Sequence, residues 1–99
     1  MYNLRSNEIS QLFKSIRTIK TEEECYMFFE DACTVKEIQD IAQRFQAAIM
    51  LKDGKNYSEV SSLTGMSSAT ISRVNKCVEY GEGGYNLAID RMKKENAND

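Results

Sequence analysis

The chain of 99 residues contains no histidine. Histidine is the commonest general base and metal ligand in proteins, so its absence excludes histidine-dependent catalytic triads, zincins and mononuclear histidine sites. The three cysteines, Cys25, Cys33 and Cys77, include no Cys-x-x-Cys pair, which excludes a zinc ribbon or a thioredoxin-like redox motif within one chain. Because no secretion signal is evident and free cysteines are usually buried, we expect reduced, mostly buried, structural thiols.

Long apolar segments are also lacking. None approaches the ~18–20 residues that cross a bilayer, and residues 1–10 do not form the apolar stretch of a signal peptide. We therefore expect a cytoplasmic protein without a membrane partner. The length fits one domain, because domains cluster near ~100–150 residues. Hydrophobic residues make up 41% and charged residues 28%, as in a globular chain rather than a disordered one.

Proline is absent and all five glycines lie at or after residue 54, which favours helices. Apolar side chains recur at helical spacing over 9–19 and again over 35–49, and neither segment alternates as a strand would. The pattern predicts an all-α fold of six helices, at about 7–19, 22–31, 35–52, 57–64, 68–79 and 84–95. We expect a single helical domain over 1–95 and a frayed polar tail at 96–99.

Local signals mark where these helices begin and end. Thr21 is followed by Glu24, and Thr34 by Glu37, each with the spacing of a capping box. Gly54 stands after the long helix, where a left-handed residue is expected.

The helix predicted at 22–31 is apolar nearly all round, because it carries Tyr26, Met27, Phe28 and Phe29 in succession. One interpretation encloses this helix in a small monomeric core. The other, which we favour, packs its far side on a second subunit, because helical domains of ~100 residues bury limited surface alone. The sequence therefore favours a homodimer.

Charge is unevenly distributed along an acidic chain of pI about 5.2. Residues 22–40 carry seven acidic residues and one lysine, whereas residues 41–79 carry five basic and three acidic residues. This balance argues against non-specific coating of nucleic acid, which needs many phosphate contacts. It allows a local positive surface over the second segment.

Residues 57–79 have the layout of a helix-turn-helix. A short amphipathic helix meets Gly65, which turns the chain, and a second helix opens at Ser67 or Ser68. Ser61 is small where two helices cross closely, and Met66, Ile71 and Val74 give the second helix an inner face. Two alternatives stay open: a glycine-centred turn between helices is a common structural element, and small polar residues are also good caps.

The outward side chains of this segment suit DNA. Short residues at the start of the second helix let the backbone approach base edges, and longer polar ones reach phosphates or purines. Two lysines further back add phosphate contacts. The predicted DNA-binding residues are Ser67, Ser68, Ala69, Thr70, Ser72, Arg73, Asn75, Lys76, Lys52 and Lys55.

Between residues 34 and 73 the chain resembles the tryptophan repressor (TrpR) family, in particular its TrpR-like YerC/YecD branch. Thr34, Arg44, Leu51, Gly54 and the segment GMSSATISR at 65–73 carry the resemblance. It implies an intertwined homodimer of six-helix subunits, whose two helix-turn-helices are spaced for successive major grooves.

The resemblance also implies a small-molecule effector pocket between the long helix and the recognition helix. The residues that match it are Thr34, Arg44, Thr70 and Arg73. Three residues depart from the family pattern: Val74 replaces a glycine, Asp31 an apolar residue and Cys77 a serine. Because a branched Val74 should intrude on a ring site, tryptophan is not the expected ligand. Arg44 and Arg73 could instead form ion pairs or contact phosphate.

We therefore predict a dimeric, sequence-specific DNA-binding transcriptional regulator of repressor type that binds double-stranded DNA, with no cofactor and no metal. The alternative is a dimeric protein-interaction module with a vestigial helix-turn-helix, whose acidic residues 22–40 bind a basic partner. An enzyme is not expected, because no catalytic constellation stands out.

Overall fold

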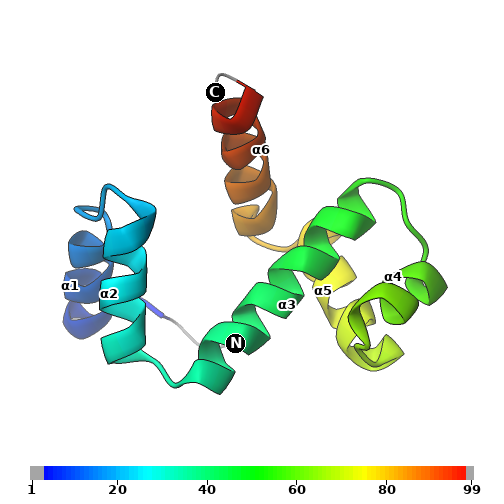
Figure 1. Cartoon of the computed structure of the whole chain (residues 1–99), viewed down its shortest axis with the longest axis horizontal. Coiled ribbons are helices and arrows are strands. Elements are labelled where there is room, and N and C mark those ends of the chain that lie inside the picture. The colour runs from blue at the N-terminus through cyan, green and yellow to red at the C-terminus, as the bar shows by residue number, and fades with distance from the viewer. Residues whose placement is uncertain (1–3, 98–99) are drawn as a thin grey trace. The chain divides into compact units, whose positions relative to one another are not determined.

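The chain is all-α, as predicted. The computed structural model describes residues 4–97, and over that range it contains six helices and no strand (Figure 1). The helices are α1 (Asn7–Ile16), α2 (Glu22–Ala32), α3 (Val35–Lys52), α4 (Tyr57–Thr64), α5 (Ser68–Tyr80) and α6 (Gly84–Ala97). No helix in this range is both long and apolar enough to cross a membrane.

Four helix ends differ from the prediction. α2 ends at Ala32 and α5 at Tyr80, each one residue later than predicted. α1 ends at Ile16 rather than near residue 19, because a three-residue turn replaces the helical hydrogen bonds there. The amide of Thr18 donates to the Ser15 carbonyl at 3.0 Å, and the Thr18 hydroxyl donates to the same oxygen at 2.7 Å. α6 continues to Ala97, two residues beyond its predicted end. The last two residues of the predicted tail, 98–99, lie outside the described residues.

The predicted start signals act as caps. Thr34 Oγ1 accepts from the Glu37 amide at 3.1 Å, and Glu37 Oε1 accepts from the Thr34 amide at 2.8 Å, so α3 begins with a full capping box. The backbone hydrogen bond from Thr34 to the Glu37 carboxylate is the main cause that holds the pKa of Glu37 below its usual value, and a side-chain hydrogen bond with Thr34 adds to it. At α2, Thr21 Oγ1 accepts from the Glu24 amide at 3.1 Å, but the Glu24 carboxylate bonds the amide of Lys20 instead.

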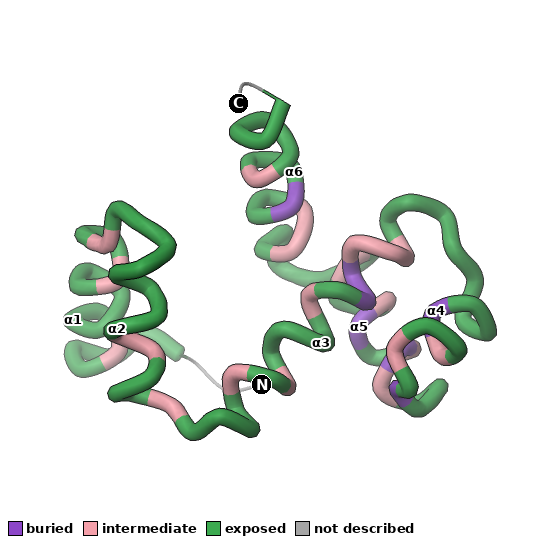
Figure 2. The backbone as a smooth tube through the Cα atoms, in the orientation of Figure 1, coloured by how far each residue is buried: buried purple, intermediate pink, exposed green. Residues whose placement is uncertain are grey.

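The described chain divides into two compact units, residues 4–38 and 39–97. In the first unit no described residue is buried (Figure 2), and Tyr26 and Met27 are more than half exposed. Phe28 and Phe29 meet edge to face, with ring centroids 5.1 Å apart, yet both stay partly exposed. Within this unit, α1 and the adjoining residues therefore leave α2 largely uncovered.

The second unit has a small continuous core (Figure 2). Its buried residues come from α3, α4, α5, α6 and the turn between α4 and α5. They are Ala47, Ala48, Val60, Met66, Ile71, Val74 and Ile89. Since α5 contributes both Ile71 and Val74 to this core, its opposite side is left for solvent or a ligand.

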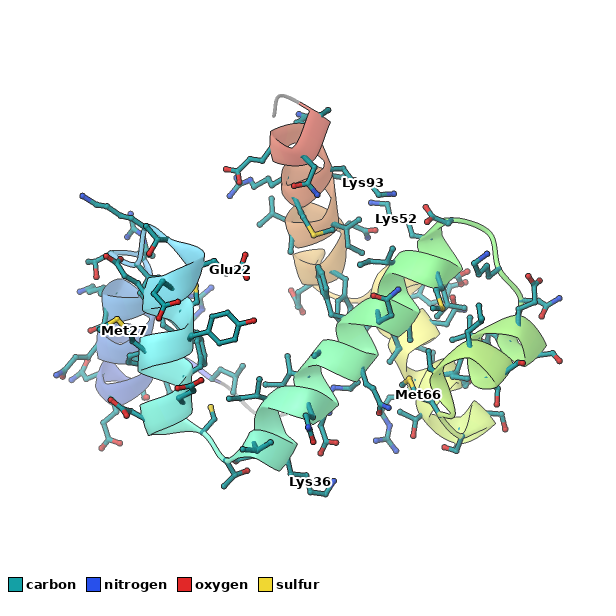
Figure 3. The ribbon with its side chains drawn as sticks, in the orientation of Figure 1. Glu22, Met27, Lys36, Lys52, Met66 and Lys93 are labelled. Atoms are coloured by element: carbon teal, nitrogen blue, oxygen red, sulfur yellow. The ribbon has the colours of Figure 1, made fainter. Side chains whose placement is uncertain are left out.

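α6 is held in the second unit by contacts to α3 and α5. Lys52 Nζ lies 2.7 Å from Asp90 Oδ1, and Lys93 Nζ lies 3.0 Å from Asp53 Oδ1; Figure 3 shows the two lysines where α3 ends beside α6. The side chain of Asn86 donates through Nδ2 to the carbonyl of Val78 at 3.0 Å. The last helix therefore packs within the second unit.

The expectation of buried thiols is wrong for two of the three cysteines. Cys25 and Cys77 are exposed, and Cys33 is partly buried. Cys25 lies on α2, whose surroundings hold no buried residue. Cys77 follows the exposed Arg73 by four residues and so shares its helix face, away from the core.

Candidate nucleic-acid interface

The turn between α4 and α5 depends on Gly65. Its φ of +75° is left-handed, and a Cβ built there would meet nothing within 4 Å, so the glycine is needed for its backbone conformation rather than for space. The Gly65 amide donates to the Ser61 carbonyl at 2.8 Å. After two more residues α5 begins, capped by Ser67, whose Oγ accepts from the Thr70 amide at 3.2 Å. The helix, tight turn and helix predicted for 57–79 are present.

Side chains of α4 bind the turn. Thr64 Oγ1 donates to the Val60 carbonyl at 2.7 Å and accepts from the Met66 amide at 3.1 Å. Ser61 Oγ donates to the Met66 carbonyl at 2.9 Å. Both backbone polar groups of Met66 are therefore bonded to hydroxyls of α4, while its side chain, 7% exposed, is buried in the core (Figure 3).

The predicted DNA-binding residues of 67–76 gather on α5 and its cap. Exposed members are Ser67, Ser68, Ala69, Arg73 and Lys76, and partly buried members are Thr70, Ser72 and Asn75. Ser67 and Thr70 also bond each other, with 3.0 Å between their hydroxyl oxygens. Capping thus accounts for these two hydroxyls, whereas Ser68 and Ala69 leave the first turn of α5 with short, exposed side chains.

Lys52 and Lys55, the two predicted lysines outside α5, differ in exposure and in partners. Lys55 is exposed in the connection between α3 and α4, where its amide donates to the Met50 carbonyl at 3.1 Å. The ammonium of Lys52 forms the ion pair with Asp90 and its side chain is 28% exposed. The positive charge of Lys52 is therefore partly balanced by α6.

The residues proposed to line an effector pocket fall in both units. Thr34 belongs to residues 4–38 and uses its hydroxyl to cap α3, whereas Arg44, Thr70 and Arg73 belong to residues 39–97. Both arginines are exposed. Val74 is 2% exposed and lies in the buried cluster with Ala47 and Ala48 of α3, among others, so its branched side chain is part of the core.

The structure shows two features that the sequence analysis does not predict. One is an open, largely apolar cavity of about 280 Å³ on the first unit, lined by Glu22, Cys25, Tyr26, Phe29, Glu30 and Ile38. The other is the set of side chains that fix the turn, including Gln43, whose Nε2 donates to the Thr64 carbonyl at 3.4 Å. Bonds from helix hydroxyls to nearby carbonyls are common enough that Thr64 could have been suspected; Gln43 gave no local signal.

The exposed face of α5 carries two cations, Arg73 and Lys76. Among residues 4–97 no group of three or more cysteine, aspartate or glutamate side chains is placed to hold a metal ion. The arrangement offers hydrogen-bond donors, short side chains and two cations on one exposed helix, a combination suited to base edges and phosphates.

The sequence model for the Trp repressor protein matches residues 7–93. The uncharacterized protein YerC of Bacillus subtilis (strain 168) is 50% identical over 91 residues, covering 92% of this chain and 88% of that protein. The crystal structure of a TrpR-like protein from Eubacterium eligens ATCC 27750 superimposes with a TM-score of 0.86 at 42% identity, covering 91% of this chain and 93% of that one. A candidate Trp repressor from Staphylococcus aureus gives a TM-score of 0.85 at 44% identity, covering 91% and 90%. The chain belongs to the Trp repressor family of DNA-binding regulators.

Proposed function

We propose that this protein is a sequence-specific transcriptional regulator that binds double-stranded DNA with α5 as its recognition helix. The observation that carries the proposal is the geometry of α4, the left-handed Gly65 and α5, which leaves the first turns of α5 exposed. In a helix-turn-helix these N-terminal turns contact base edges in the major groove. Membership of the Trp repressor family supports the same function.

The residues of α5 divide by the contacts that their chemistry allows. Ser68 and Ala69 are short enough to let the helix backbone approach base edges, and the Ser68 hydroxyl can donate or accept. Arg73 and Lys76, both exposed, carry the positive charge needed for phosphates or guanine. Lys55 extends the phosphate contacts to the start of α4.

The active form in this proposal is a homodimer. Five large apolar side chains on and beside α1 and α2 are 42% to 65% exposed. They are Leu4, Leu12, Phe13, Tyr26 and Met27. A soluble protein rarely leaves so many large apolar side chains uncovered, and a second copy would cover them. The exposure of Cys25 in a single chain has the same explanation, since it lines the apolar cavity on α2.

Tryptophan is not required in this proposal. The support is Val74, whose side chain is packed in the core between α3 and α5, where a flat ring would have to enter. Displacing a packed branched side chain costs about 1–3 kcal/mol. In the selection described below, enrichment that requires a free amino acid other than tryptophan would reveal a different effector.

The test is a selection of bound fragments from sheared genomic DNA at moderate salt, with and without free amino acids. A dimeric regulator enriches a palindrome whose half-sites lie about one helical turn apart. Enrichment that requires tryptophan would contradict the role assigned to Val74. Failure to enrich any sequence under any condition would contradict the proposed function.

One observation favours a second candidate, a dimeric protein-interaction module. The apolar cavity on α2 is flanked by Glu22 and Glu30, within a segment of seven acidic residues and one lysine. Such a surface suits a partner with basic and apolar side chains. This candidate predicts equally weak binding to every DNA fragment in the selection.

A further inference from the structure

Met66 is the single residue between the left-handed Gly65, which ends α4, and Ser67, which caps α5. Its side chain is anchored in the core, and both its amide and its carbonyl are bonded to α4 hydroxyls, at 3.1 Å from Thr64 Oγ1 and 2.9 Å from Ser61 Oγ. The path of the chain is thus fixed immediately before α5 starts.

A third contact extends this support to α3. Gln43 Nε2 donates to the Thr64 carbonyl at 3.4 Å, and Thr64 Oγ1 in turn donates to the Val60 carbonyl at 2.7 Å. Residues on either side of Gly65 are therefore tied to two helices of the same unit. A glycine in a turn otherwise adds conformational freedom, so these bonds restrict the angle at which α5 leaves α4.

We propose that Ser61 and Thr64 are positioning residues, which touch no DNA and set the placement of the first turn of α5. The inference rests on the proposed function, in which that turn contacts base edges. Recognition requires side chains held within about 0.5 Å of their productive positions by supporting hydrogen bonds. Loss of the Thr64 hydroxyl leaves the Met66 amide without its partner and loosens the start of α5, while the phosphate-contacting cations stay in place.

The experiment compares Thr64→Val, which keeps the shape and removes the hydroxyl, with Thr64→Ser, which keeps the hydroxyl. Ser61→Ala is the second test, and Ser62→Ala, an exposed serine one residue along α4, is its matched control. Affinity is measured for the selected duplex and for a scrambled duplex, and hydrogen exchange is followed at the Met66 amide of the full chain.

We expect Thr64→Val and Ser61→Ala each to lower affinity for the selected duplex about fivefold to tenfold, the effect of losing one hydrogen bond to the Met66 backbone. Affinity for the scrambled duplex should change by less than about twofold. Thr64→Ser and Ser62→Ala should bind as the wild type does. The Met66 amide should exchange faster in Thr64→Val and not in Thr64→Ser.

Wild-type affinity in Thr64→Val, or an equal loss on both duplexes, overturns the positioning role. Failure of Thr64→Ser to restore binding does the same. If the wild type binds no sequence, the proposed function fails. The exchange measurement still decides whether the Thr64 hydroxyl fixes the turn. Equal exchange rates at the Met66 amide in the wild type and in Thr64→Val would refute that structural role.

Discussion

Lys52 Nζ lies 2.7 Å from Asp90 Oδ1 and joins the end of α3 to the middle of α6. The hydrogen bond from Lys52 holds the pKa of Asp90 below its usual value. A second pair, Lys93 with Asp53 at 3.0 Å, lies beside it. The two pairs together hold α6 against the end of α3 within the second unit.

The Lys52–Asp90 pair predicts a specific dependence of stability on pH. Because the pKa of Asp90 is lowered on folding from its ordinary 3.8, the stabilisation is complete above that value and is lost as pH falls through the lower folded value. Asp90→Asn should therefore lower the melting temperature near neutral pH and have no effect at pH values below the folded pKa. Glu95→Gln, at an exposed acid of α6, is the control. A deficit in Asp90→Asn that persists unchanged in strong acid would refute the assignment.

Gly65→Ala should destabilise the chain. The residue has a φ of +75°, and a side chain in that region costs roughly 1–2 kcal/mol although no neighbour obstructs it. Urea unfolding measures the loss, with Gly84→Ala as the control, since a Cβ there also meets nothing and its φ is not positive. Equal midpoints for the two variants would show that the turn does not require a left-handed residue.

Arg73→Ala should weaken binding to the selected duplex by roughly 1–3 kcal/mol. If Arg73 contacts phosphate, affinity falls for all sequences, and the slope of log affinity against log salt decreases by about one phosphate contact. If Arg73 contacts guanine, the preference for guanine at that position is lost instead. Arg91→Ala, an exposed arginine of α6, is the matched control. Unchanged affinity in Arg73→Ala removes this residue from the interface.

Met27→Asp should separate the subunits. Met27 is 62% exposed on α2, and a carboxylate there would be buried without a partner in the proposed dimer. Sedimentation should give twice the chain mass of 11.3 kDa for the wild type and the single-chain mass for the variant. Leu63→Asp, at a comparably exposed apolar residue of α4, should stay dimeric. A wild-type mass of one chain contradicts the dimer.

Most of the fold was predictable because its determinants are local. Thr34, Gly65 and Ser67 act within three or four residues of their own positions, and each does in the structure what its spacing predicts. The end of α1 was misplaced because the apolar pattern continues to Ile19, whereas the Thr18 hydroxyl ends the helix earlier. Cys77 was misjudged because burial depends on which face of α5 meets the core.

The sequence predicts that part of the candidate interface which lies in one continuous segment. The candidate residues within 67–76 lie on α5 and its cap, and five of them are exposed without help from distant parts of the sequence. The Asp90 partner of Lys52 lies 38 residues away, and the Thr64 partner of Gln43 lies 21 residues away. Contacts at such separations depend on how the helices pack, which helical periodicity does not specify.

The central claim, that two copies of α5 contact bases, is tested most directly by repeating the genomic selection with Ser68→Ala and with Ser62→Ala. Ser68 is exposed in the first turn of α5, and Ser62 is an exposed serine of α4. The account predicts that Ser68→Ala weakens the base preference at the same position in both halves of the palindrome. Ser62→Ala should select the same sequence as the wild type. An unchanged consensus with Ser68→Ala, or a wild-type consensus without two-fold symmetry, would contradict it.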